Sequence, residues 1–161
     1  MKKIIHTLLL LFFITNIQAQ KNCIVQNATA FYSVVIPGNM PVDENGNQRP
    51  LKIHKSRTIF ITSNCAAEPL INKVIYDNMN APFFIEKANK EEVANLMDDM
   101  NNKIKLNAPK SSFLWKITVV ESGGIVLPEN PKKMVLQWKS KNKINMLFIK
   151  TERQLATIPM Y

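Results

Sequence analysis

Residues 134–149 read MVLQWKSKNKINMLFI, and this stretch decides the fold. Apolar side chains recur at every second position in its first part and again in its last part, which is the period of a strand with one buried face. These side chains are Met134, Leu136, Trp138, Ile144, Met146 and Phe148. The polar run at 140–143 separates the two parts. The stretch therefore predicts a β-hairpin.

The same alternation of apolar and polar side chains recurs upstream of the hairpin. It predicts strands over residues 28–36, 57–63, 72–77, 81–87 and 113–119. Asn45-Gly46 suits the tip of a hairpin between the first two, and residues 78–80 are expected to join the third strand to the fourth. Short strands at close spacing predict a mainly β domain.

One segment carries a helical pattern instead. Asn89 can cap a helix and Glu92 stands three residues later, as in a capping box. Apolar side chains then follow with helical spacing at Val93, Leu96, Met97, Met100 and Ile104. We therefore expect a two-sheet antiparallel β-sandwich with one short inserted helix at about 90–101.

The first residues resemble a secretory signal. Lys2 and Lys3 precede a mostly apolar run at 4–17, and Ala19 provides a small residue for cleavage. We expect a signal peptide at 1–19 and a single domain at 20–161. This leader looks bacterial, so the mature protein is expected in the periplasm or outside the cell, without a transmembrane helix.

The two cysteines are expected to form a disulfide, because export delivers the chain to an oxidising compartment. Cys23 and Cys65 are 42 positions apart. The chain-entropy model gives such a crosslink about 4 kcal/mol of stabilisation. The rival use of Cys23 as a lipid anchor needs a small residue before it, and Asn22 stands there.

The remaining residues restrict the chemistry. His54 is the one histidine of the expected mature chain, so a zinc site of several histidines is excluded, and a Ser-His-Asp arrangement has a single candidate base. We identify no catalytic residue, metal ligand or cofactor motif. Carboxylates are the plentiful reactive groups that remain.

Without the leader, 19 basic residues face 12 acidic ones, a formal charge of +7. The candidate patch for an anionic partner consists of Trp138, Lys139, Lys141 and Lys143. We expect no nucleic-acid partner, because the chain is exported and only three of its basic residues are arginine. Two further origins of the positive charge stay open: a compositional bias toward lysine, and lysines that protect sheet edges.

These features favour an exported non-enzymatic domain that binds a protein or another cell-envelope component, including an anionic glycan or lipid surface. Two alternatives remain. One is a small envelope hydrolase that uses paired carboxylates. The other is a small outer-membrane β-barrel, since several strands alternate and Tyr161 supplies a terminal aromatic residue.

Overall fold

The computed structural model describes residues 23–35, 43–47, 54–95, 103–121 and 125–156, so the expected signal peptide lies outside it. The described residues form strands and connecting turns, and they include no helix that would span a membrane. The strands are β1 (Val25–Val35), β2 (His54–Ser63), β3 (Leu70–Tyr76), β4 (Met79–Ala81), β5 (Phe83–Lys87), β6 (Glu91–Asn95), β7 (Lys103–Asn107), β8 (Phe113–Val119), β9 (Met134–Ser140), β10 (Lys143–Ile149) and β11 (Glu152–Gln154).

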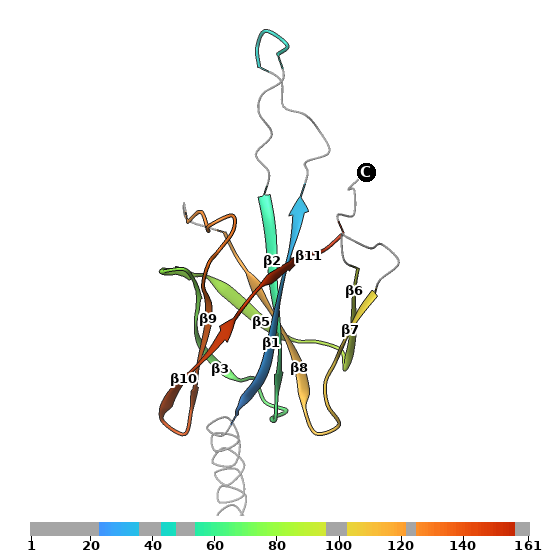
Figure 1. The fold of residues 1–161 in the computed structure, drawn as a ribbon, viewed down its shortest axis with the longest axis vertical. Helices are drawn as coiled ribbons and strands as arrows, with labels where there is room; N and C mark the ends of the chain where they lie inside the picture. The colour runs from blue at the N-terminus through green and yellow to red at the C-terminus, as the bar shows by residue number, and fades with distance from the viewer. Residues whose placement is uncertain (1–22, 36–42, 48–53, 96–102, 122–124, 157–161) are drawn as a thin grey trace, which may run out of the picture.

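These strands form three sheets (Figure 1). The largest has the order β11-β1-β2-β8-β5, the second the order β10-β9-β3-β4, and the third contains β6 and β7. Neighbouring strands are antiparallel except β1 and β11, which run parallel. The described strands thus form open sheets, and none of the sheets closes on itself.

The two larger sheets share one hydrophobic core. Ile59, Ile61 and Ile117 belong to the five-stranded sheet, Val74 and Leu136 to the four-stranded sheet, and all five are at most 1% exposed in the same cluster. Their alternate spacing along each strand is what turns one face of each sheet inward. The expected mainly β fold is confirmed, and two of its sheets pack face to face; the third sheet and the parallel β1–β11 pair were not expected.

A second, smaller cluster lies on the other side of the five-stranded sheet. Phe31 of β1, Phe60 of β2 and Leu114 of β8 are buried there, and Ile104 and Leu106 of β7 pack against them. The β6–β7 hairpin therefore covers the outer face of this sheet, which makes this part of the molecule three layers thick.

The predicted disulfide is present. Cys23 lies two residues before the start of β1, Cys65 lies two residues after the end of β2, and their Cα atoms are 5.4 Å apart. The amide of Ile24 donates to Asn64 Oδ1 at 2.8 Å beside the crosslink. The bond thus fastens one end of the β1–β2 hairpin. The predicted turn lies at the opposite end, and Gly46 adopts a φ of +80° within it.

The predicted helix is wrong over the part of its range that the structure describes, because Glu91–Asn95 is strand β6; residues 96–101 lie outside the described residues. Strand β7, which the sequence pattern did not reveal, pairs with β6 along all five residues. Glu91 and Lys105 form an ion pair across the two strands at 2.8 Å. Pairing with a later segment has overridden a local helical pattern.

The expected pairing of residues 72–77 with 81–87 also differs from the structure. β3 turns back at Asp77, which has a φ of 53°, and pairs with the short β4. Pro82 then separates β4 from β5, and β5 crosses to the other sheet to pair with β8. A proline lacks the N–H that a continuing ladder needs, which explains the break at this point.

Candidate functional site

The β9–β10 hairpin is shaped by its two turn residues. Lys141 and Asn142 both have positive φ values, 48° and 62°, as a two-residue type I′ turn requires. Ser140 and Lys143 pair directly beside the turn. This tight turn places Lys139, Lys141 and Lys143 together at one exposed end of the hairpin.

Strand β10 turns large apolar side chains to the outside. Alternation alone does not say which set of side chains faces the core, and the structure turns Leu147 and Ile149 inward. Ile144, Met146 and Phe148 lie on the opposite side and are 62%, 55% and 62% exposed. Monomeric proteins rarely leave several neighbouring side chains of this size in water, so this surface is a candidate interaction site.

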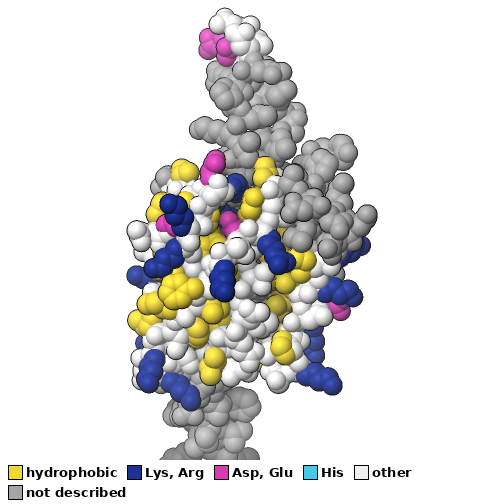
Figure 2. All heavy atoms as spheres, viewed as in Figure 1, with side chains coloured by type: hydrophobic (Ala, Val, Ile, Leu, Met, Phe, Trp, Pro, Cys, Tyr) yellow, Lys and Arg dark blue, Asp and Glu magenta, His cyan; other side chains and the backbone are white. Residues whose placement is uncertain are grey.

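We name this outer surface the β10 face and define it by Leu70, Lys133, Lys139, Ile144, Met146 and Phe148. Lys139 of β9 lies directly opposite both Ile144 of β10 and Leu70 of β3. The Lys133 ammonium lies 5.5 Å from the centre of the Phe148 ring. Figure 2 shows hydrophobic side chains on the side where β9 and β10 lie, with basic side chains around them.

The strands of the four-stranded sheet carry only positive charge, and an acid beside the β10 face is Asp77 in the β3–β4 turn, which accepts a hydrogen bond from the Lys133 amide at 2.9 Å. The strands themselves contain Lys73, Lys139 and Lys143 but no aspartate or glutamate. The residues of β9 that pair with the exposed apolar residues of β10 are either neutral or cationic. The resulting surface is both apolar and cationic.

The predicted patch is only partly brought together. Its three lysines lie at the surface, whereas Trp138 is 6% exposed and belongs to the core between the sheets. The indole is on the opposite side of β9 from Lys139, because successive side chains alternate. The binding role of the lysines stays a prediction. The sequence pattern placed Ile144, Met146 and Phe148 in the apolar set of a strand with one buried face, and the structure instead exposes them beside the lysines.

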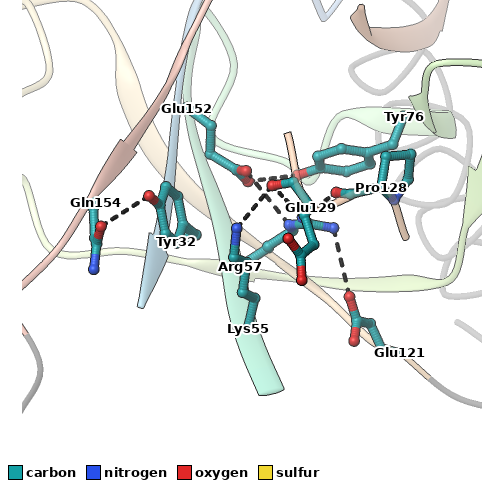
Figure 3. Close-up of polar contacts among 9 residues, drawn as sticks. All are labelled: Tyr32, Lys55, Arg57, Tyr76, Glu121, Pro128, Glu129, Glu152 and Gln154. Atoms are coloured by element: carbon teal, nitrogen blue, oxygen red, sulfur yellow. Dashed lines mark hydrogen bonds and ion pairs between the residues drawn. The ribbon is translucent and has the colours of Figure 1, made fainter. Parts of the chain in front are cut away.

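A second cluster of polar residues is buried around Arg57 (Figure 3). We name it the Arg57 cluster and define it by Arg57, Tyr76, Glu121 and Glu152. Arg57 is 1% exposed, and its guanidinium lies 3.4 Å from a carboxylate oxygen of Glu152 and 3.5 Å from one of Glu121. It also donates to the carbonyl of Pro128 and lies 5.0 Å from the Tyr76 ring centre.

Glu152 is the most enclosed acid of this cluster. Its side chain is 4% exposed, and Tyr76 donates its hydroxyl proton to Glu152 Oε1 at 3.3 Å. Burial raises the pKa of Glu152 above the ordinary value of 4.5, although Arg57 and the Tyr76 hydrogen bond both act to lower it. Burial raises the pKa of Tyr76 as well.

Two neighbouring contacts extend the cluster. Lys55 donates to the carbonyl of Glu129 at 2.8 Å and lies 4.6 Å from the Tyr32 ring centre. The Tyr32 hydroxyl donates to Gln154 at 2.9 Å. The Tyr32–Gln154 bond fastens β11 to β1, the Arg57–Glu152 ion pair fastens β11 to β2, and the Lys55 bond joins β2 to the segment before β9.

A small hollow lies beside the Arg57 cluster. Its volume is about 90 Å³, and it is lined by Lys55, Arg57, Glu121, Val126, Leu127 and Glu129. This volume suits a few water molecules rather than a polymer substrate. Glu121 and Glu152 both pair with one buried guanidinium, and of these two acids Glu121 lines the hollow.

The described residues contain no group of three or more histidine, cysteine, aspartate or glutamate side chains arranged to hold a metal ion. His54, the candidate base, is the first residue of β2. The sequence matches no protein-family model and no curated protein significantly, and the structure matches no solved structure. The surface and its chemistry therefore carry the functional argument.

Proposed function

We propose that this chain is an exported, non-enzymatic binding domain that holds a component of the cell envelope through the β10 face. The observation that carries the proposal is the exposure of three large apolar side chains on one strand. Ile144, Met146 and Phe148 are each more than half exposed although the adjoining core is closely packed. Covering them with a partner would remove apolar surface from water, which favours binding.

The charges around these side chains favour an anionic partner. Lys133 and Lys139 border the apolar residues, and Lys141 and Lys143 stand at the hairpin end. The four strands contain no acidic residue, so the positive charge of Lys139 and Lys143 is uncompensated within them, whereas Asp77 in the β3–β4 turn lies beside Lys133. Candidates are an acidic envelope protein, an anionic glycan and an anionic lipid surface.

Export is the part of the proposal that depends on the leader at 1–19. A disulfide such as Cys23–Cys65 is typical of proteins that mature in an oxidising compartment, so it supports a periplasmic or secreted location. An exported domain meets envelope components directly, which is consistent with a binding role at the cell surface.

The test is co-sedimentation of the protein with isolated bacterial envelopes after expression of the full 161-residue sequence. The test variant combines Met146→Ser and Phe148→Ser, and the matched control is Phe84→Ser, which removes a 51% exposed phenylalanine from β5. We expect the wild type and the control to bind equally. The double variant should bind about tenfold more weakly, since it loses two apolar contacts.

All three proteins carry the same N-terminus, so any contribution of the leader cancels in the comparison. Circular dichroism establishes that each is folded. If the folded wild type stays in the supernatant, or if the double variant binds as well as the wild type, the proposed function is wrong.

A further inference from the structure

We infer that the component bound by the β10 face is an anionic phospholipid surface. This inference rests on the proposed function and names the partner of the same surface. It is carried by the order of apolar and cationic side chains along β10, by the kind of basic residue present, and by the charge that a second copy of the chain would bring.

The apolar side chains form a stripe that is bounded by lysines at both ends. Ile144 and Phe148 are four residues apart, which is about 14 Å along a strand. Lys139 and the hairpin turn lie at the Ile144 end, and Lys133 lies at the Phe148 end. This order allows the stripe to enter the boundary between headgroups and acyl chains while the ammonium groups stay at the phosphates.

The basic residues around the stripe are all lysines. A lysine carries a compact charge on a flexible stem, whereas arginine is preferred where a partner offers carboxylates or phosphates in a fixed, bidentate geometry. Lipid headgroups form a mobile array without such a geometry. Lysine is also depleted from the centres of protein interfaces, where Lys139 would lie if the partner were an acidic protein.

A second copy of this chain does not fit the surface. Stacking two β10 faces would bring Lys139 of both copies together in an apolar environment, and the four strands hold no acid to compensate it; Asp77, in the β3–β4 turn, lies beside Lys133 at the other end of the stripe. Pairing two β10 edges would extend the sheet but leave Ile144, Met146 and Phe148 uncovered, because side chains project from the sheet faces. An anionic lipid surface would both cover the apolar side chains and neutralise the lysines.

The test uses two kinds of vesicle: phosphatidylcholine alone, and phosphatidylcholine mixed equally with phosphatidylglycerol. The full chain and its variants are floated with each on a density gradient. We expect the wild type to favour the anionic vesicles by at least about tenfold and to lose this preference in high salt. Replacing Lys139, Lys141 and Lys143 by glutamine should weaken binding on the order of 100-fold, since each lysine near an anionic surface contributes roughly fivefold.

Two controls make the outcome specific. Lys90→Gln combined with Lys110→Gln removes exposed lysines that lie outside the four-stranded sheet and should retain most of the anionic preference. Met146→Ser with Phe148→Ser should weaken binding, whereas Phe84→Ser should not. Equal binding to both vesicles, or unchanged binding by the triple-lysine variant, would overturn the lipid inference.

The envelope experiment separates the two levels of the argument. If vesicles are not bound but envelopes still bind the wild type and lose the Met146→Ser/Phe148→Ser variant, the lipid inference is wrong and the binding function stands. If neither vesicles nor envelopes distinguish that variant from the wild type, both are wrong.

Discussion

The two larger sheets each have an outer face, and one of these faces is covered by another part of the chain while the other is exposed. On the five-stranded sheet, Phe31, Phe60 and Leu114 point outward and are at most 7% exposed, because the β6–β7 hairpin packs over them. On the four-stranded sheet, Met146 and Phe148 point outward and are more than half exposed. No described segment of the chain covers this second face.

The difference teaches that apolar content does not decide which face is exposed. Both outer faces carry aromatic and aliphatic side chains, and what separates them is the presence of a covering hairpin. The covered face contributes to stability, since its side chains are removed from water in the isolated molecule. The uncovered face keeps the same driving force available for an external partner.

Truncating the covered face should have the largest effect. Phe31 is fully buried and packs edge to face against Phe60, with ring centres 6.0 Å apart. Phe31→Ala should therefore lower the free energy of unfolding by about 3–5 kcal/mol. Urea denaturation measures this change, and a loss below about 1 kcal/mol would show that the β6–β7 hairpin does not form a packed layer.

A smaller, pH-dependent effect on stability is expected at Glu152 of β11, the strand that follows β10 and forms an edge of the five-stranded sheet. Because burial raises the pKa of Glu152, the folded protein binds this proton more tightly than the unfolded chain does. Its contribution to stability is thus present below pH 4.5 and is lost as the pH rises through the raised pKa. The stability of the wild type minus that of Glu152→Gln should fall as the pH rises above 4.5.

Urea titrations of both proteins across this range test the sign. If the stability of the wild type relative to Glu152→Gln increased with pH, the attraction of Arg57 for the ionised carboxylate would outweigh the cost of burying that charge. Such a result would also make β11 more firmly attached at neutral pH than we expect.

The smallest effect on folding is expected on the uncovered face. Phe148 is 62% exposed, so Phe148→Ala should change the free energy of unfolding by less than about 0.5 kcal/mol. Thermal unfolding of Phe148→Ala and Phe31→Ala, each compared with the wild type, measures how much stability each face contributes. A large loss of stability would show that Phe148 is held by contacts within the molecule and is not available to a partner.

Features with a local signature were predictable from the sequence. The β9–β10 hairpin follows from alternation on both sides of a polar turn, and the Cys23–Cys65 bond was expected because the chain has two cysteines and a leader that resembles an export signal. The inward side of β8 also agrees with the pattern, since Trp115, Ile117 and Val119 all belong to the core. In each case short-range information and tertiary packing favour the same structure.

Features that depend on distant segments were not predictable. Glu91–Asn95 becomes a strand only because β7 pairs with it, and β11 is three residues long, too short to show a period. The Arg57 cluster gathers side chains from β2, β3, β11 and the segment after β8, whose proximity no local spacing encodes. The β10 face was missed for a related reason: alternation marks two sides of a strand but not which side another layer covers.

The parallel pairing of β1 with β11 has a consequence for when the protein can finish folding. Tyr32 and Gln154 are hydrogen-bonded although 122 positions separate them, so the first strand gains its second neighbour only from the last described strand. Contacts of such long range are slow to close, because a large loop must lose its freedom first. A growing chain must therefore wait for residues 152–154 before Arg57 meets Glu152, which delays completion of the sheet until β11 has been made.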